Sequence, residues 1–416
     1  MAYRARRNSV EVVLGNHKKQ YLRIRDYLQT ILDKNPGRRC IVSTYDPYPL
    51  GSNPRFKGLF ICLNAQIEGF KYGCRPFIGV DGCFVKLTNG AQVLAASGRD
   101  GNDNLFPLAF GVVRKEDYEG WHWFLQELKY ALGGKVGPYG KWTIMTDRQK
   151  MYFLLVNRGF ETAMEELKKE REGAWEWLTK IPTKHWDKHA FDTTCKTGLV
   201  VNNISEVFNS YIIIYSDKPI VTMLDLIRTK LMGRFNSNRE DIATAQWEIT
   251  PRYVEKLEIE KRDARYCRHV CAGRGIWQVT CGEMTYAVNL QDRTCGCFKW
   301  DATGVPCKHA VSAIYKSKQH PEDFVHDCFK KLAYQRAYQH IIYPVPSSDD
   351  WTKTDTPDID PPKFLKHPGR PKKNMKGGDE PSQPSGRARM TTITCSNCHK
   401  QGHKYTSCSQ KHRPDL

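Results

Sequence analysis

Two short segments of the chain carry cysteine and histidine at spacings that could bind a metal ion. Near the end of the sequence, the pattern Cys-x2-Cys-x4-His-x4-Cys is formed by Cys395, Cys398, His403 and Cys408. Three thiolates and one imidazole are ligands that Zn²⁺ takes in tetrahedral sites. The residues between these ligands are too few and too polar to bury a core. We therefore expect zinc to supply the folding free energy of this segment.

The second segment reads Cys295-Gly-Cys297 and, nine residues later, Cys307-Lys-His309. A Cys-x-Cys pair fits the end of a β-hairpin, where both thiols reach one metal if the strand bends, and the intervening Gly296 permits that bend. The Cys-x-His pair precedes AVSAIYK, which predicts that it lies at the first turn of a helix, where Pro306 is tolerated. A metal bound here would join the hairpin to the helix.

Two other groups of metal-type side chains are weaker candidates. His185 and His189 are spaced i, i+4, but no thiol or second acidic pair lies near them in the sequence. A set of four is formed by Cys267, His269, Cys271 and Cys281. Its spacing matches no zinc module, and its residues are expected at the start of a hairpin. The sequence therefore predicts two zinc sites.

The elements that must position these groups come from a chain of 416 residues, long enough for two or three domains. Its net charge of +19 and a pI of about 9.2 favour a polyanionic partner. Nucleic acid is a better candidate than a membrane, because no apolar run approaches the roughly 20 residues that span a bilayer. A basic solvated surface would give the same charge, but the zinc motifs agree with nucleic acid.

The fifteen cysteines do not indicate a secreted disulfide protein. The N-terminal MAYRARRNSVEVV has no apolar core of a signal peptide, and six of the cysteines belong to the two metal motifs. Others, such as Cys62, Cys74 and Cys83, fall in apolar stretches where a free thiol packs as a small hydrophobe. A reducing compartment, cytosol or nucleus, is expected.

The first part of the chain predicts an α/β fold. An amphipathic helix is expected over 17–33 and another over 121–132. Strands are expected at 38–45, 58–65, 77–87, 91–98, 105–113 and 141–147. Three consecutive strands, a helix and one more strand suit a mixed sheet flanked by helices. In this arrangement Asp81 lies on the strand at 77–87, the first of the three consecutive strands, and Asp147 ends the strand at 141–147.

Beyond Asp147 the pattern becomes helical. Helices are predicted over 161–178, 202–213 and 222–235, and a β-hairpin over 276–291 leads into Cys295. From about residue 344 to 394 the chain is rich in Pro, Ser, Asp, Lys and Gly and loses apolar periodicity, which predicts a disordered linker.

The segment TCGCFKWDATGVPCKHAVSAI (294–314) closely resembles the SWIM zinc finger, which occurs in Mutator-like transposases and in the plant far-red-impaired-response proteins derived from them. Blocks over 56–86, 98–128, 144–150 and 202–212 are similar to a Mutator-like transposase core. The spacing at the end of the chain is similar to that of the zinc knuckle, a module associated with single-stranded nucleic acid.

The transposase resemblance implies an RNase H-like fold in which three carboxylates bind two Mg²⁺ or Mn²⁺ ions. Asp81 in IGVDGCF matches the first carboxylate and Asp147 in IMTDRQK matches the second. Glu206 in NNISEVFN is the match for the third, although a helix can also favour an acid in its first turn.

The sequence also departs from the family pattern. Asp147 and Glu206 are 59 residues apart, which is short for the family. The family's Cys-x2-His pair has no counterpart between them, and its upstream zinc-containing DNA-binding domain has none before the core. The resemblance therefore implies a truncated core that holds Glu206 poorly in a productive geometry.

The tract Pro-Gly-Arg-Pro-Lys-Lys (368–373) resembles half of an AT-hook. Arg370 could lie in a narrow A·T minor groove with Lys372 and Lys373 on phosphates, or the tract could be a nuclear-import signal. Both alternatives favour the nucleus.

Together these features divide the chain into five parts. They are a helical and stranded region (1–75), an RNase H-like core with a deletion after about 150 (76–245), a small ββα SWIM region (246–343), a basic linker (344–394) and a knuckle (395–408). We expect a zinc-binding, nucleic-acid-binding protein derived from a Mutator-like transposase and catalytically impaired. The alternatives are an active transposase that uses Mg²⁺ or Mn²⁺, and an RNA- or single-strand-binding protein that acts through the knuckle. Oligomeric state stays open.

Overall fold

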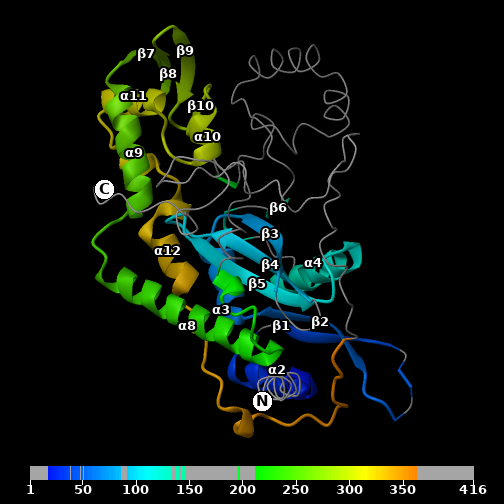
Figure 1. Ribbon diagram of the computed structural model, residues 1–416. Helices are drawn as coiled ribbons and strands as arrows, with labels where there is room; N and C mark the ends of the chain where they lie inside the picture. The colour runs from blue at the N-terminus through cyan, green and yellow to red at the C-terminus, as the bar shows by residue number, and fades with distance from the viewer. Residues whose placement is uncertain are drawn as a thin grey trace, which may run out of the picture. The chain divides into compact units, whose positions relative to one another are not determined.

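The computed structural model describes residues 17–37, 39–46, 48–49, 51–85, 91–133, 137–139, 142–146, 195–196 and 211–362 (Figure 1). In these residues the protein is an α/β structure. It contains a mixed sheet of six strands, a smaller antiparallel sheet of four strands, and helices that pack on them. None of the helices in the described ranges is long and apolar enough to cross a membrane.

The larger sheet has the strand order β1-β2-β5-β4-β3-β6. Its strands are β1 (Arg39–Tyr45), β2 (Arg55–Cys62), β3 (Phe77–Phe84), β4 (Gln92–Arg99), β5 (Leu105–Val113) and β6 (Thr143–Thr146). β3 and β6 are parallel, and the other neighbours are antiparallel. β5 is buried along its whole length and β4 up to its last residue. Their apolar sequences fit central strands that are covered on both faces.

Helices cover this sheet. They are α2 (Ile24–Lys34), α3 (Asn64–Gly73), α4 (Tyr118–Leu132), α8 (Ile220–Thr244) and α12 (Lys331–Tyr338). α12 packs against both α3 and α8, as Figure 1 shows. The contact with α3 is close because Gly69 and Gly73 present no side chain, and a Cβ on either would overlap the backbone of Ala337. α12 therefore ties the later part of the chain to the sheet.

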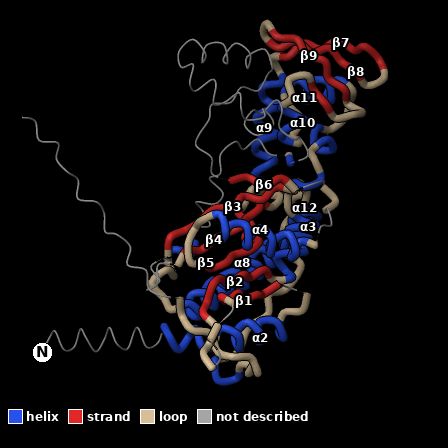
Figure 2. Tube along the Cα trace, turned by 90° about the vertical axis from the view of Figure 1, so that its right-hand side faces the viewer, coloured by secondary structure: helices blue, strands red, loops and turns tan. Residues whose placement is uncertain are grey.

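The smaller sheet has the order β10-β9-β8-β7, with β7 (Cys267–Gly273), β8 (Ile276–Cys281), β9 (Met284–Asn289) and β10 (Thr294–Cys295). Helix α11 (Lys308–Lys316) lies against β7, β8 and β9 (Figure 2). α9 (Pro251–Ala264) packs against α11, and the short α10 (Lys299–Thr303) follows β10. Trp277, Val279 and Val288 of the sheet meet Ala313 and Ile314 of α11 in a compact apolar cluster.

A group of ion pairs around Asp103 joins α9 to the loop between β4 and β5. The buried Arg75 pairs with Asp103 of this loop, and Arg252 Nε lies 3.3 Å from the other oxygen of Asp103. Burial alone would raise the pKa of Asp103, but Arg75, Lys256 and further basic neighbours outweigh it and hold this pKa below its usual range. Thr250 Oγ1 also donates to the carbonyl of Gly101 at 2.7 Å.

Most predicted elements in the described ranges are confirmed. The helix expected over 17–33 is present, with an irregular position at Arg23 before α2. The helix expected over 121–132 is α4, which begins three residues earlier because Asp117 caps it by accepting a hydrogen bond from Gly120 N. The hairpin expected over 276–291 is β8 and β9.

The structure corrects one boundary. Residues 344–362, expected to begin a disordered linker, pack on the first helix of the sheet region. The Trp351 ring lies 5.1 Å from that of Tyr27, and Thr352 N donates to Thr30 Oγ1 at 2.9 Å. Ile359 is fully buried. Apart from a short 3-10 helix at Ser348–Asp350 and a bridge between Asp360 and Arg55, aromatic and hydroxyl anchors hold this stretch, which is why periodicity did not reveal it. The predictions for 161–178, for His185 and His189, and for most of 202–213 lie outside the described residues.

Candidate metal centre

The four ligands of the first metal motif come from a strand, a turn and a helix. Cys295 is the last residue of β10, and Cys297 follows it in the turn toward α10. The chain bends at Gly296, as the sequence predicted, because Phe298 N donates to the carbonyl of Cys295 at 2.8 Å and closes a turn around Gly296 and Cys297. Phe298 itself has a φ of 58°. Cys307 is the N-cap of α11, and His309 is the second residue of that helix. The predicted junction of hairpin end and helix start is therefore present.

The structure brings these four residues to one point. One ligand atom from each of Cys295, Cys297, Cys307 and His309 lies within 4.8 Å of the other three. His309 Nδ1 is 3.8 Å from both Cys295 Sγ and Cys307 Sγ, and the Sγ atoms of Cys297 and Cys307 are 3.5 Å apart. A tetrahedral zinc ion with Zn–S bonds of about 2.3 Å places its sulfur ligands roughly 3.8 Å apart. The donor set and its spacing thus fit Zn²⁺.

Three thiolates in this space would need a compensating cation. The pKa of Cys297 is held far below its usual range, because Cys295 and then Cys307 hydrogen-bond to its sulfur. The same hydrogen bond to Cys297 raises the pKa of Cys295 to about 12, and the pKa of Cys307 is also raised. Without a metal, Cys297 is therefore stabilised as a thiolate, whereas Cys295 and Cys307 are stabilised as thiols. A divalent metal would let all three sulfurs ionise together.

Neighbouring side chains hold the ligands in place. Asp301 Oδ2 accepts a hydrogen bond from Cys295 N at 3.1 Å. The buried Glu260 of α9 accepts one from Lys308 N at 2.8 Å and pairs with Lys299. The ring of Tyr286 lies 4.7 Å from the His309 ring. Fixing the backbone on both sides of the ligands is how a second layer of residues orients a metal site.

The finger is larger than the predicted ββα unit. α9 and strand β7 are not among the predicted elements, although both pack on the finger. A signal for α9 was available, because Pro251 follows Thr250 and suits the first position of a helix. A signal for β7 was the turn at Gly273, Arg274 and Gly275, all of which have positive φ.

The weaker cysteine group does not converge as a set of four. Cys271 is exposed on β7, and His269 Nδ1 lies 3.0 Å from Ser312 Oγ. Cys267 and Cys281 do meet, because they are directly opposed on β7 and β8. Their sulfurs and a ring nitrogen of His309 lie within 4.8 Å of one another.

The carboxylate site can be followed at one position. Asp81 lies on β3 opposite Ala95 of β4, and its Oδ1 accepts a hydrogen bond from Gly82 N at 2.9 Å. On its other side β3 pairs in parallel with β6, where Val80 is in register with Thr146. β6 ends at Thr146, one residue before Asp147 in the sequence.

The other predicted site residues lie outside the described ranges. They are Asp147 and Glu206 of the carboxylate set, Arg370, Lys372 and Lys373 of the basic tract, and Cys395, Cys398, His403 and Cys408 of the second zinc motif.

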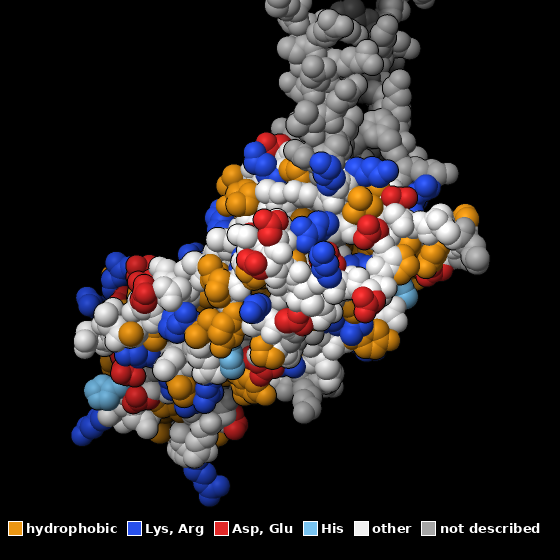
Figure 3. All heavy atoms as spheres, turned by 90° about the horizontal axis from the view of Figure 1, so that it is seen from below, with side chains coloured by type: hydrophobic (Ala, Val, Ile, Leu, Met, Phe, Trp, Pro, Cys, Tyr) orange, Lys and Arg blue, Asp and Glu red, His pale blue; other side chains and the backbone are white. Residues whose placement is uncertain are grey.

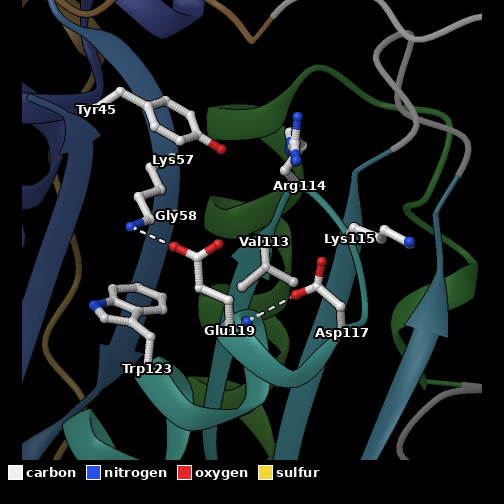
Figure 4. Close-up of a pocket in the computed structure, with 10 residues that line it drawn as sticks. Tyr45, Lys57, Gly58, Val113, Arg114, Lys115, Asp117, Glu119 and Trp123 are labelled. Atoms are coloured by element: carbon white, nitrogen blue, oxygen red, sulfur yellow. Dashed lines mark hydrogen bonds and ion pairs between the residues drawn. The ribbon is translucent and has the colours of Figure 1, made fainter.

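A pocket near the β1 edge of the large sheet, away from β3 and β6, does not add a second site. It lies between β1, β2, β5 and the start of α4, with Tyr45 and Trp123 facing it (Figure 4). Lys57 Nζ and Glu119 Oε1 are 2.8 Å apart across it. Trp123 packs on Gly58, where a Cβ would come within 2.9 Å of the indole ring. Lys57 and Glu119 are thus engaged with each other, and Asp117 with the backbone of Gly120.

Comparison with protein families gives two matches. The MULE transposase domain matches residues 77–166, and the SWIM zinc finger matches residues 286–318. The first range covers β3 to β6, and the second contains all four ligands of the metal cluster. No curated protein matches the chain. No solved structure matches it either.

Proposed function

We propose that this protein, which carries a MULE transposase domain and a SWIM zinc finger, is a zinc-dependent nuclear protein that binds DNA and has lost complete transposase activity. The observation that carries the proposal is the cluster of Cys295, Cys297, Cys307 and His309 within the SWIM match. In this site zinc acts as a structural crosslink between β10 and α11. The ligands bind and orient the metal, and they leave no open position for chemistry.

The charge distribution supports a nucleic-acid partner. Residues 366–416 contain eleven Lys and Arg and three Asp and Glu, a net charge of +8 out of +19 for the whole chain. Over the described residues on the face shown in Figure 3, basic and acidic side chains are interspersed and form no continuous basic stripe. The basic excess of 366–416, with Arg370, Lys372 and Lys373, is therefore the proposed phosphate-binding part of the chain.

Two features support the loss of complete activity. The MULE match ends at residue 166, so that Glu206 lies outside it. Asp147 and Glu206 are separated by only 59 residues. A two-metal reaction needs all three carboxylates to be held firmly around the ions.

DNA binding by the full-length, zinc-loaded protein tests the proposal. We expect affinity for duplex DNA that falls steeply with salt, because cation release accompanies each phosphate contact. Replacing Arg370, Lys372 and Lys373 by Gln should reduce both the affinity and the salt slope. Cys271→Ser, a change at an exposed thiol of the same protein, should leave both unchanged. An affinity that is independent of salt and of the basic tract contradicts the proposal.

An active transposase remains the second candidate, because one observation favours it. The parallel pairing of Val80 with Thr146 brings the strand that carries Asp81 beside the strand that leads into Asp147, as in an RNase H-like core. If the protein cleaves terminal-repeat DNA with Mg²⁺ or Mn²⁺ and Asp81→Asn abolishes the cleavage, the core is active and the loss of activity is refuted.

A further inference from the structure

Two cysteines outside the zinc cluster form a pair that no family match explains. Cys267 and Cys281 are directly opposed on the antiparallel strands β7 and β8. Their side chains are hydrogen-bonded to each other. The SWIM match begins at residue 286, so both thiols lie outside it. Cys295, Cys297, Cys307 and His309 make a complete four-ligand zinc site, and the pair shares only His309 with it.

The backbone geometry of the pair suits a disulfide. Opposed residues of antiparallel strands have Cα atoms about 4.5 to 5.5 Å apart. Disulfides form over Cα separations of roughly 4.4 to 6.8 Å, so no strand movement is required. Cys267 and Cys281 are both free thiols in the structure, so that a disulfide between them would be a new bond.

The two thiols differ in access. Cys267 is 8% exposed, whereas Cys281 is only half-buried and hydrogen-bonds to the side chain of Lys308. A small oxidant therefore reaches Cys281 first, and Cys267 is positioned behind it as the resolving thiol. Cys271 on the same strand is exposed but faces Trp277, so it has no partner thiol opposite it.

We propose that Cys267 and Cys281 are a redox modification site, at which a peroxide converts the dithiol to a disulfide while the neighbouring zinc finger stays loaded. Cys281 Sγ attacks one peroxide oxygen, the O–O bond breaks, and the departing hydroxide leaves as water with the thiol proton. Cys267 Sγ then attacks the sulfenic sulfur, the S–O bond breaks, and a second water leaves. Two thiols and one peroxide thus give one disulfide and two waters.

Selectivity follows from the two environments. In the loaded finger the sulfurs of Cys295, Cys297 and Cys307 are bound to the metal, which keeps their electron pairs from the oxidant. Cys267 and Cys281 adjoin this site through His309 but are not needed as ligands. The disulfide would also link the two strands that pack on α11, so zinc should leave the oxidised protein more slowly.

The test uses the zinc-loaded full-length protein treated with hydrogen peroxide. Free thiols are alkylated, disulfides are reduced and labelled with a second reagent, and the peptides are identified by mass spectrometry while bound zinc is measured in parallel. We expect the second label on Cys267 and Cys281 together, with zinc content unchanged and zinc release to a chelator slowed several-fold. Reduction with dithiothreitol should reverse all of these changes.

Matched variants separate this role from others. Cys271→Ser should oxidise as the parent protein does, whereas Cys281→Ser should leave Cys267 unlinked. The proposal is overturned if both thiols stay reduced, or if they oxidise only after zinc has been lost. It is also overturned if the untreated Cys267→Ser variant binds less zinc, because the pair would then supply a metal ligand. The measurement on the parent protein decides the question even if a variant folds poorly.

Discussion

The zinc finger and the large sheet obtain their order in different ways. The finger's four ligands lie within residues 295–309, and local turns at Phe298 and Gly304 bring them together. In the large sheet, β3 pairs with β6, which is more than 60 residues away in sequence. The predicted carboxylate set would also need Glu206, which is still farther from Asp81. A metal site whose ligands are close in sequence should tolerate a deletion elsewhere in the chain. A site whose residues come from distant strands and helices should not.

The two regions also differ in how much apolar surface they bury. β4 and β5 are central strands that are covered on both faces. The small sheet is covered by α11 on one face, and Val270 and Ile276 on its strands remain 65% and 44% exposed. Apolar burial is the main favourable contribution to folding, so the large sheet should be stable by packing and the finger should depend on its metal.

The strongest test of this difference is the loss of one zinc ligand. Cys307→Ser removes a sulfur that is 1% exposed at the start of α11. We expect the loss of one equivalent of zinc and of the finger's folding free energy, on the order of 10 kcal/mol for a structural zinc site. Hydrogen exchange should show unprotected amides in β7 to β10 and α11 but native protection in β4 and β5.

The matched control for that experiment is Cys271→Ser, because Cys271 is exposed and has no ligand role in the cluster. Its zinc content and exchange pattern should equal those of the parent protein. If the finger keeps its protected amides in Cys307→Ser, its apolar cluster is sufficient and the contrast between the two regions is removed.

A smaller effect is expected where the core depends on close packing. In Gly73→Ala the new Cβ overlaps the backbone N and Cα of Ala337, so α12 must move away from α3. We expect a loss of about 3 kcal/mol in the free energy of unfolding, in the range of severe overpacking. Zinc content should be unchanged. Urea unfolding followed by tryptophan fluorescence measures the first quantity and metal analysis the second.

Gly233→Ala is the control with the opposite sign. Gly233 lies inside α8, and beyond the backbone of its own helix no atom lies within 4 Å of the position that its Cβ would take. Alanine should stabilise the helix by about 0.8 kcal/mol, because glycine loses more backbone entropy. Destabilisation by both substitutions would show that α-helical glycines here do not act through the α3–α12 contact.

Periodicity and spacing predicted the local parts of the molecule well. The apolar runs of β4 and β5, the helix α4 and the hairpin of β8 and β9 follow from short-range patterns. The Cys-x-Cys and Cys-x-His pairs predicted a metal held between a hairpin end and a helix start. The bend at Gly296 was also predicted. The left-handed conformation of Phe298 was not, because residue type does not indicate it at a residue other than glycine.

Long-range contacts could not be predicted in the same way. The ion pairs of Asp103 with Arg75 and with Arg252 of α9 join residues that are far apart in sequence, and nothing in the neighbouring sequence marks them as partners. Trp351 packs on Tyr27 and holds residues 344–362 against the folded part of the chain, although their composition is typical of a linker. The opposition of Cys267 and Cys281 depends on the register of a strand that was not predicted.

The last prediction concerns the pH dependence of stability and His326, next to the cluster that joins α9 to the rest of the chain. Burial, and then the charge of Lys196, lowers the pKa of His326 to about 4 from 6.5. Its neutral Nδ1 accepts a hydrogen bond from Cys328 N at 3.3 Å, and protonation would remove that acceptor. The unfolded chain binds the proton more readily than the folded one. Stability should therefore fall as pH decreases from about 6.5 to 4, by roughly 2 to 3 kcal/mol.

The comparison of the parent protein with His326→Gln isolates this effect, because acid also weakens zinc binding in both proteins and that loss cancels. The difference in the free energy of unfolding should shift in favour of His326→Gln as the pH falls through this window. His320→Gln, which changes an exposed imidazole on the same segment, is the matched control. If the two variants respond alike to pH, the imidazole at 326 is not held neutral by the fold. The acid sensitivity of this junction would then come from the finger's ligands alone.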